Sequence, residues 1–320
     1  MKLNCVDFLD ISHHFSEDEI MVQHTTREFV DKEIMPDIER HFEAGTIDFD
    51  LIPQFGKLGF LGMNLPEEYG CAGMSNVAYG IMCQEMERGD SGIRSFVSVQ
   101  GSLVMYPIFA YGSEEQRKKW LPKLASGEFI GCFGLTEPNH GSNPGGMLTR
   151  ATSVEGGYKL NGAKMWITNG TIADIAVVWA KCDDEKIRGF VVEKGMKGFS
   201  APEMKHKWSL RASITSELVF DDVFIPEENL LPNVVGLKGP LGCLNQARFG
   251  IGWGAIGSAM AVYEAAVSYA KERVQFGKPI GGFQLIQDKL AWMLTEITKA
   301  QMLAIEVGRN KDDGSLRHQQ

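Results

Sequence analysis

The sequence lacks the patterns of several large protein classes. It has no C-x-x-C pair, and its six scattered cysteines give neither a disulfide framework nor a zinc site. Free cysteines in this number suit a reducing compartment. The seven histidines lack metal-ligand spacing, so we expect no metal site.

The sequence is also short of positive charge. A net charge of −9 argues against nucleic acid as the main partner, because binding phosphate backbones needs a basic face. An anionic small ligand is still compatible with this balance if a few cationic side chains are placed locally.

Targeting and membrane signals are missing as well. The first 26 residues carry one Lys and no Arg, and no apolar h-region follows, so we expect no transit or signal peptide. The longest apolar stretch, near Ile251–Val262, is rich in Gly and Ala and too short to span a bilayer. We expect no membrane partner and a cytoplasmic protein, or one of the mitochondrial matrix if this is a mature eukaryotic chain.

What remains is the composition of a globular protein. The 320 residues allow about two domains with sizeable cores, and 44% apolar and 23% charged residues are typical values. The residue pattern changes twice along the chain. We predict an α+β fold with an N-terminal helical domain (1–128), a middle antiparallel β domain of sandwich or barrel type (129–238) and a C-terminal helical domain (239–320).

Capping residues punctuate the first region. Ser16–Glu19 and Ser113–Gln116 have the pattern of capping boxes, in which two side chains satisfy backbone N–H groups at a helix start. Ser75 is placed to cap a helix that reaches Gly89. A further helix is expected over 91–111.

The middle region consists of short β-branched or aromatic runs that are broken by turns. The neighbourhoods of 155–157 and 182–184 have the composition of hairpin tips. No helical pattern separates the runs, which favours an antiparallel sandwich or barrel over a doubly wound sheet.

Two long helices are expected in the last region. The first runs from about Asn245 to Arg273, and the second runs from about Phe283 to a stop at Gly308. The second carries an apolar stripe that includes Leu290 and Leu294. Because a bundle usually needs about four helices, we expect this domain to be incomplete and the stripe to be exposed.

A formal G-x-G-x-x-G occurs at 252–257. A dinucleotide-binding fingerprint must follow a strand and open a helix, because the pyrophosphate sits at the N-terminus of that helix. Here the preceding residues already belong to a helix, so glycines for close helix packing are the better interpretation.

The carboxylate clusters predict no acid–base pair. Glu85 and Glu87 lie at the end of an amphipathic helix, and Asp183 and Asp184 lie at a hairpin tip. We expect both clusters on solvated surface.

Arg94 is more informative. It lies near the start of a helix that is apolar on nearly every face, and no Asp or Glu occurs between Asp90 and Glu114. A buried guanidinium needs an anionic partner. Ser98 shares its face and is able to bind the same anion. The alternative is that Arg94 pairs with a distant acid or extends its head to solvent.

Several longer motifs are specific. They are F-G-L-T-E-P-N-H-G-S (133–142), W-I-T-N (166–169) and R-V-Q-F-G-K-P-I with F-Q-L-I-Q (273–287). Together they resemble the acyl-CoA dehydrogenase family from end to end. Within this family, R-S-F-V-S-V-Q-G-S-L-V-M (94–105) and G-C-L-N-Q-A-R (242–248) look like glutaryl-CoA dehydrogenase.

The resemblance implies FAD as the cofactor. It places segment 133–142 along the isoalloxazine, W-I-T at 166–168 on its other side, and two further residues on the FAD of a neighbouring subunit, which implies a homotetramer. The Gly-rich backbone of the first segment agrees, because small residues let N–H groups approach an anion. The implied FAD residues are Phe133, Gly134, Leu135, Thr136, Gly141, Ser142, Trp166, Ile167, Thr168, Arg273 and Gln284.

The resemblance also implies glutaryl-CoA as the acyl-CoA substrate. Leu244, Asn245 and Arg248 would meet the CoA portion, and Ser142 would lie near its phosphates. The terminal carboxylate of the acyl chain would then be the anionic partner of Arg94, and a plain fatty acyl chain has no such group. The implied carboxylate-binding residues are Arg94, Ser95 and Ser98.

In the family, a glutamate removes the α-proton while FAD takes the β-hydride, and the glutaryl enzymes then decarboxylate the product to crotonyl-CoA, a reaction of amino-acid degradation. The implied electron acceptor is an electron-transfer flavoprotein. The usual base lies in a Y-E-G-T-like stretch, which does not occur in this sequence. The alternative position, just before the arginine that matches Arg248, is Ala247. The Tyr263-Glu264 pair lies in the wrong helix, so we predict no catalytic residue in this chain.

A second departure is the stretch 143–146, Asn-Pro-Gly-Gly, where relatives more often place Asp after the Ser. It affects the expected local geometry of the loop and not FAD binding itself.

Two hypotheses follow. In the first, the chain is a C-terminally truncated form of a protein that oxidises and decarboxylates glutaryl-CoA. In the second, it is a catalytically inactive acyl-CoA- or flavin-binding module.

Overall fold

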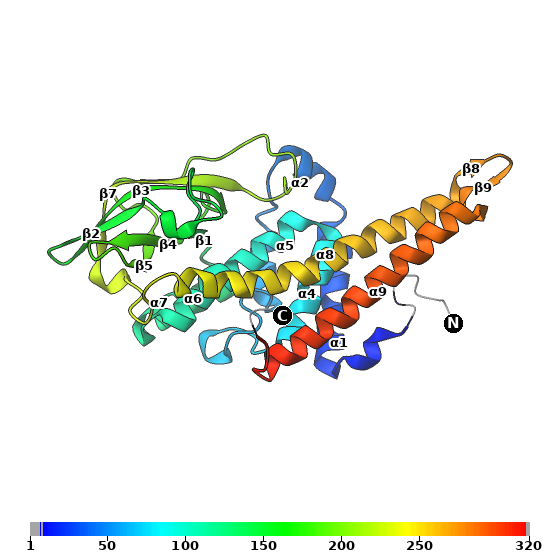
Figure 1. Cartoon of the computed structure of the whole chain (residues 1–320), viewed down its shortest axis with the longest axis horizontal. Coiled ribbons are helices and arrows are strands. Elements are labelled where there is room, and N and C mark those ends of the chain that lie inside the picture. The colour runs from blue at the N-terminus through cyan, green and yellow to red at the C-terminus, as the bar shows by residue number, and fades with distance from the viewer. Residues whose placement is uncertain (1–6, 8, 318–320) are drawn as a thin grey trace. The chain divides into compact units, whose positions relative to one another are not determined.

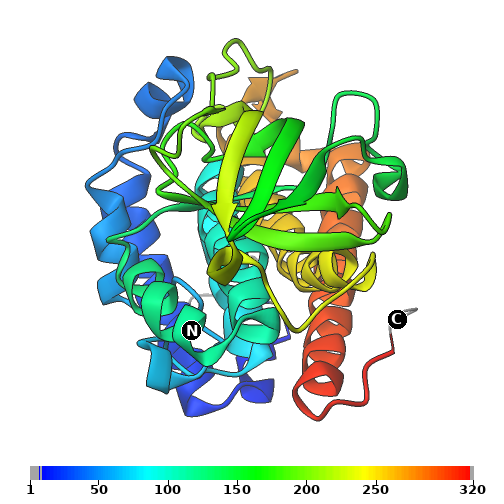
Figure 2. The ribbon, with the colours of Figure 1, turned by 90° about the vertical axis from the view of Figure 1, so that its left-hand side faces the viewer.

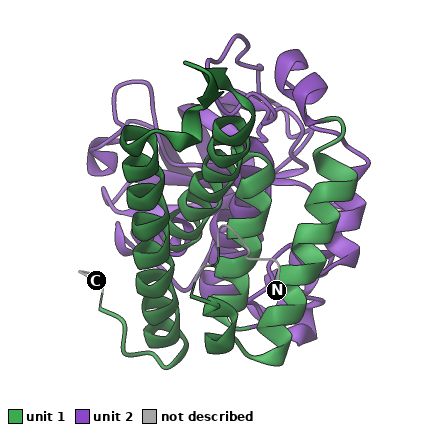
Figure 3. Cartoon of the chain, turned by 90° about the vertical axis from the view of Figure 1, so that its right-hand side faces the viewer, with its two compact units in different colours: residues 1–37, 75–91, 249–320 green, residues 38–74, 92–248 purple. Residues whose placement is uncertain are grey.

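The structure, a computed structural model, describes residue 7 and residues 9–317. The described residues form two compact units (Figure 3), unit 1 from Met1–Asp37, Ser75–Ser91 and Phe249–Gln320, and unit 2 from Ile38–Met74 and Gly92–Arg248. Along the chain, helices come first, strands second and helices last, which confirms the α+β fold. The units follow contacts rather than chain order, so the domain boundaries after residues 128 and 238 stay predictions.

Unit 1 is mainly helical. Helix α1 (Glu17–Phe29) begins at the predicted capping box, where the Ser16 hydroxyl accepts a hydrogen bond from the Glu19 N–H and the Glu19 carboxylate accepts one from the Ser16 N–H. Ser75 caps α4 (Asn76–Gly89), also as predicted. A 3-10 turn precedes α1 and a π-helical turn follows it, at η1 (Ile11–His14) and η2 (Val30–Ile34).

Two long helices complete unit 1. Helix α8 (Lys238–Glu272) starts in unit 2 and continues into unit 1, and α9 (Gln284–Asp312) follows it. A hairpin and a short turn connect them, formed by β8 (Val274–Gln275), β9 (Lys278–Pro279) and η7 (Ile280–Gly282).

The apolar stripe of α9 is not exposed, contrary to our expectation. Ile297 is buried in a cluster with Met260 and Tyr263 of α8, and Leu290 and Leu294 pack against this cluster. The two helices therefore cover each other along this face.

Helix α9 also continues past Gly308, its expected stop, to Asp312. A Cβ atom on Gly308 would lie 2.6 Å from Cγ2 of Val77 on α4. This glycine therefore permits close packing of two helices rather than ending one. Helix α8 begins earlier than expected, at Lys238, and Pro240 is tolerated there because it lies in the first helical turn.

Glu85 is not on solvated surface, which corrects a second expectation. It is fully buried on α4 and accepts hydrogen bonds from Nε and Nη2 of Arg27, each at 2.9 Å. Nε of Arg88 donates to the same carboxylate at 3.2 Å. Arg27 lies far away in the sequence, so the local pattern gave no sign of this network.

Unit 2 begins with short helices. The predicted helix over 91–111 is one helical run, in which a π-helical stretch separates α5 from α6, and α7 begins at the predicted Ser113–Gln116 capping box. These elements are α2 (Ile38–Ala44), α3 (Leu51–Lys57), η3 (Glu67–Tyr69), α5 (Ser91–Ser98), η4 (Val99–Met105), α6 (Tyr106–Tyr111) and α7 (Glu114–Ser126).

Seven strands of unit 2 form one sheet with the order β1-β4-β2-β3-β7-β6, and β5 pairs with β4 (Figure 1). Figure 2 shows β7, in yellow-green, alongside β3, in green. The strands are β1 (Gly131–Gly134), β2 (Arg150–Val154), β3 (Gly157–Thr168), β4 (Ile175–Cys182), β5 (Ile187–Glu193), β6 (Phe199–Ser200) and β7 (Thr215–Pro226), and the 3-10 turns η5 (Pro144–Gly146) and η6 (Glu227–Asn229) flank them.

The sheet confirms the predicted β domain and both hairpin tips, since β2–β3 and β4–β5 turn near residues 155–156 and 183–186. Two pairings, β1–β4 and β2–β4, are parallel, and we did not expect them. They join strands that are not neighbours in the sequence, so no turn signal marks them.

The glycines at 252–257 provide a test of the helix-packing interpretation. A Cβ atom on Gly257 would lie 1.9 Å from the Gln84 carbonyl oxygen, whereas one on Gly252 would meet nothing within 4 Å. We therefore expect Gly257→Ala to lower the free energy of unfolding by about 1–3 kcal/mol. Gly252→Ala, the matched control in the same helix, should raise it by about 0.5–1 kcal/mol. Urea unfolding measures both, and equal effects would contradict this packing.

Candidate functional site

The structure brings the first two motifs of the predicted site together. Segment 133–136 leaves β1, whose residues pair with β4, and Phe133 packs edge-on against Trp179 with ring centroids 6.4 Å apart. The Met165 N–H, just before the W-I-T-N motif, donates a hydrogen bond to the Thr136 carbonyl at 2.9 Å. Two segments that lie far apart in the sequence are therefore joined at backbone level.

A buried ion pair reinforces this junction. The Lys164 side chain on β3 is fully buried, and its Nζ donates to Oε1 of Glu137 at 2.8 Å and to the Leu135 carbonyl at 3.2 Å. The Glu137 carboxylate also accepts hydrogen bonds from the N–H groups of Leu148 (2.6 Å) and Thr149 (3.0 Å). This Lys164–Glu137 pair fixes the backbone on both sides of Thr136. We had not identified it from the sequence, although a lysine within a strand pattern is a usable signal.

The environment sets the charge of both groups. Burial raises the pKa of Glu137. The hydrogen bonds from Leu148, Lys164 and Thr149 lower it by more, so that the resulting pKa is about 2. Burial lowers the pKa of Lys164 to about 8, while Glu137 acts in the opposite direction. The pair is therefore ionised at neutral pH.

Trp166 lies on an irregular part of β3. The register with β7 shifts between Lys164 and Ile167, and Trp166 has a left-handed backbone with φ of 62°. Left-handed backbone is uncommon for a bulky residue and accumulates at functional sites. The ring is 60% exposed, whereas Ile167 is buried and Thr168 is partly buried. The bulge thus turns an indole outward beside the 133–142 segment.

The remainder of the first motif forms an open loop. Glu137 and His140 exchange backbone hydrogen bonds in a tight turn, and Gly141 and Ser142 are exposed. A Cβ atom on Gly141 would meet nothing within 4 Å, so a ligand is able to approach this backbone. In the divergent stretch that follows, the Asn143 carbonyl accepts a hydrogen bond from the Gly146 N–H.

Arg94 is buried on α5, with 7% of its surface exposed. Its Nη1 donates to the Ser98 hydroxyl at 2.8 Å, and that hydroxyl donates to the Ser95 carbonyl at 3.2 Å. The predicted shared face of Arg94 and Ser98 is confirmed. The arrangement presents a cation and hydroxyl groups together in a largely apolar helix.

The residues predicted to meet CoA lie on the part of α8 that belongs to unit 2. Leu244 is partly buried, Asn245 and Arg248 are exposed, and Nη1 of Arg248 donates to Oδ1 of Asn245 at 2.5 Å. Ala247 is buried and apolar, so it offers no general base at this position.

Arg273 and Gln284 belong to unit 1. They lie at the two ends of the hairpin connection between α8 and α9, and both side chains are exposed. The structure therefore does not group them with the residues of unit 2.

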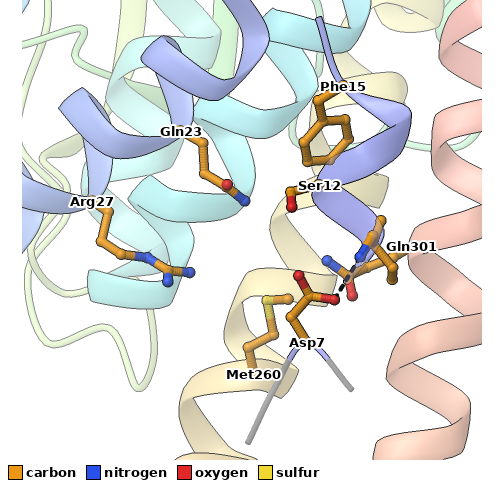
Figure 4. A pocket seen from close by; sticks show the side chains of 8 residues that line it. Asp7, Ser12, Phe15, Gln23, Arg27, Met260 and Gln301 are labelled. Carbon is orange, nitrogen blue, oxygen red and sulfur yellow. Dashed lines mark hydrogen bonds between the residues drawn. The ribbon is translucent and has the colours of Figure 1, made fainter. Parts of the chain in front are cut away.

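Unit 1 has a small pocket that contains none of the predicted site residues (Figure 4). Its volume is about 30 Å³, and its lining includes Asp7, Gln23, Arg27, Met260 and Gln301. This volume holds a water molecule and not an acyl-CoA or a flavin.

Within residue 7 and residues 9–317, no group of three or more His, Cys, Asp or Glu side chains is arranged to hold a metal ion. Among the helices of the same residues, none has both the length and the hydropathy that a bilayer crossing needs.

Three domains of one protein family match successive parts of the chain. Residues 16–128 match the acyl-CoA dehydrogenase N-terminal domain, residues 132–223 the middle domain and residues 235–320 the C-terminal domain.

Individual proteins are similar over most of their length. An acyl-CoA dehydrogenase of Bacillus subtilis (strain 168) is 40% identical over 295 residues, covering 91% of this chain and 78% of that protein. The glutaryl-CoA dehydrogenase of Desulfococcus multivorans is 38% identical, covering 93% and 79%. A crystal structure of a glutaryl-CoA dehydrogenase from Mycobacterium smegmatis in complex with FADH2 is 51% identical, with a TM-score of 0.96 and coverage of 98% and 81%.

The Lys164–Glu137 pair predicts a specific acid dependence. Because the folded pKa of Glu137 is about 2, below its ordinary 4.5, the carboxylate stabilises the protein above about pH 4.5, and this contribution is lost as the pH falls towards 2. In Glu137→Gln we expect that pH dependence to disappear. We also expect a loss of up to about 3–5 kcal/mol at neutral pH, because Lys164 is left as an unpaired buried charge.

The control is Glu185→Gln, which breaks the exposed Arg150–Glu185 pair and should cost less than about 1 kcal/mol. Urea unfolding between pH 2 and 7 measures both variants. An unchanged pH dependence in Glu137→Gln would contradict the assigned role of the pair.

Proposed function

The chain belongs to the acyl-CoA dehydrogenase family, and on that premise we propose that it is a glutaryl-CoA dehydrogenase-like flavoprotein, acting in oxidation and decarboxylation of glutaryl-CoA to crotonyl-CoA. The observation that carries the substrate assignment is the buried Arg94 with its Ser98 partner, in a helix that otherwise suits an apolar acyl chain. The similarity to two glutaryl-CoA dehydrogenase structures of M. smegmatis, at 51% and 54% identity, supports it.

FAD is the cofactor, and when bound it would supply the hydride acceptor for the β-carbon of the acyl chain. Segment 133–142 and Trp166–Thr168 fit this group, because the structure joins them through Met165 and leaves the indole of Trp166 and the backbone of Gly141 accessible. We assign Phe133, Gly134, Leu135, Thr136, Gly141, Ser142, Trp166, Ile167 and Thr168 to its binding.

Arg273 and Gln284 have a different role in this proposal. Both are exposed at the α8–α9 connection, and we assign them to the FAD of a neighbouring copy, in a homotetramer. The family uses acyl-CoA substrates and flavoprotein electron-transfer partners, and we propose an electron-transfer flavoprotein as the acceptor here.

On the substrate side, we assign Leu244, Asn245 and Arg248 to CoA, together with Ser142. Arg94 binds the distal carboxylate, with Ser95 and Ser98 beside it. A charge-assisted hydrogen bond in a buried site orients this end of the acyl chain, and it distinguishes a dicarboxylyl thioester from a fatty acyl thioester.

A second candidate function is binding of flavin and acyl-CoA without dehydrogenation. The observation that favours it is the buried, apolar Ala247 at one of the two positions where the family places its base.

Arg94→Met tests the substrate assignment. We expect it to weaken the binding of glutaryl-CoA to the FAD-loaded protein by roughly ten- to hundredfold, because a charged hydrogen bond is worth about 1.5–3 kcal/mol. Butyryl-CoA, which lacks the carboxylate, should bind nearly as before. Calorimetric titration with both thioesters measures the difference, and equal losses would show that Arg94 is structural.

Turnover distinguishes the two functions. The α-proton of a thioester is weakly acidic, and a positioned general base contributes typically about 10²–10⁴-fold in rate. If the chain only binds flavin and acyl-CoA, its turnover of glutaryl-CoA with FAD and an artificial acceptor should be slower by at least that factor than the turnover of a relative that contains the base. Turnover near that of the relative would mean that another residue of this chain acts as the base.

A further inference from the structure

The W-I-T-N motif contains two residues with left-handed backbone. Trp166 has a φ of 62° and Asn169 has a φ of 67°, and the two residues enclose Ile167 and Thr168. Left-handed backbone is uncommon for residues other than glycine, and it persists in an ordered sheet where the surroundings impose it. The segment assigned to the flavin is therefore bounded on both sides by a residue in an unusual conformation.

Asn169 occupies the third position of a tight turn. The Gly170 N–H donates a hydrogen bond to the Ile167 carbonyl at 3.4 Å, which closes the turn over residues 167–170. A positive φ at the third residue is characteristic of type II turns, and Gly or Asn adopts it most readily. Asparagine at this position therefore matches what the backbone requires.

Strand β7 holds this turn in place. Ile167 pairs with Ser216, whose hydroxyl donates to the Ile167 carbonyl at 3.4 Å. The Asn169 N–H donates to the Ile214 carbonyl at 2.8 Å. A Cβ atom on Gly170 would lie 2.0 Å from the Ser216 hydroxyl oxygen, so the turn passes β7 at a distance that only glycine permits. The backbone on both sides of Asn169 is thus anchored to the neighbouring strand.

The hydrogen bonding of the Asn169 side chain does not explain why this residue type is present. The residue is buried, with 1% of its surface exposed, and its Nδ2 has no hydrogen-bond partner among the residues that the structure describes. A buried amide donor without a partner is destabilising. The tolerance of asparagine for left-handed backbone does explain its presence.

The turn continues directly into the residues of the proposed flavin site. Thr168 precedes Asn169, and Trp166, with 60% of its surface exposed, lies three residues before it. Before Trp166, the Met165 N–H is bonded to the Thr136 carbonyl of the first motif. This short segment is therefore fixed at one end by the first motif and at the other end by the turn.

We propose that Asn169 is a positioning residue of the flavin site. It adopts left-handed backbone at low energetic cost and so holds Trp166 and Thr168 in the flavin-binding arrangement before FAD binds. The inference rests on the proposed function. The role lies in the backbone conformation of residue 169 and not in a contact between its amide and the flavin. A residue without this tolerance lets the segment relax in the free protein, and FAD binding must then restore the arrangement.

Two substitutions that remove the same amide test this role. Asn169→Gly keeps free access to left-handed backbone, whereas Asn169→Ala does not, and the two variants differ by one methyl group. We expect Asn169→Ala to bind FAD about five- to thirtyfold more weakly than Asn169→Gly in an equilibrium titration followed by flavin fluorescence. Asn169→Gly should bind FAD nearly as the wild type does. A role in folding alone would lower the urea stability of Asn169→Ala and leave its FAD affinity unchanged.

The matched control is Asp222→Ala. Asp222 also has left-handed backbone, with a φ of 52°, and it lies on β7 roughly 20 Å from the turn by strand geometry, where its N–H donates to Oδ1 of Asn161. Its replacement should lower the stability to urea and leave the FAD affinity unchanged.

Equal FAD affinities of Asn169→Gly and Asn169→Ala would overturn the proposal. If both were weakened, the amide itself would bind the flavin, and if neither changed, Asn169 would be a structural residue only. Weak binding by Asn169→Gly alone would overturn it as well, even where Asn169→Ala does not fold. A wild-type protein that holds no FAD would instead contradict the proposed function, and with it this role.

Discussion

The buried ion pair between Lys164 and Glu137 is the interaction on which the site depends. It joins strand β3 to the segment that follows β1, and it holds the carbonyl of Leu135 and the N–H groups of Leu148 and Thr149 in the same network. A buried pair of this kind contributes little net stability compared with apolar residues, but it is costly to break on one side only. Its effect is therefore positional, since it sets where the backbone on both sides of Thr136 lies relative to the bulge at Trp166.

The local features of the fold could be predicted from the sequence. Capping boxes at Ser16 and Ser113 and the hairpin tips depend on residues within a few positions of one another, and the structure has them as expected. Features that depend on distant partners could not. Glu85 is buried beside Arg27 of another helix, and Gly308 lies inside its helix, where the lack of a side chain permits close packing against Val77. The parallel strand pairs also depend on partners that are distant in the sequence.

The candidate site also divides into features that the sequence predicts and features that depend on distant partners. The motifs located its segments, and the structure brings two of them together through Met165 and Thr136. The sequence did not reveal the ion pair that holds them or the left-handed backbone of Trp166 and Asn169, because each is a consequence of tertiary contacts. Arg94 is an intermediate case. Its burial followed from the apolar helix around it, whereas its role in binding a carboxylate remains a proposal.

The central claim is that the segments fixed by the Lys164–Glu137 pair form a flavin site. Equilibrium titration of the purified protein with FAD, followed by flavin fluorescence and by the absorbance that remains after free FAD is removed, tests it most directly. The account predicts stoichiometric FAD in the wild-type protein and a much weaker affinity in Glu137→Gln under conditions in which that variant is still folded. A protein that retains no flavin absorbance after incubation with FAD would contradict it.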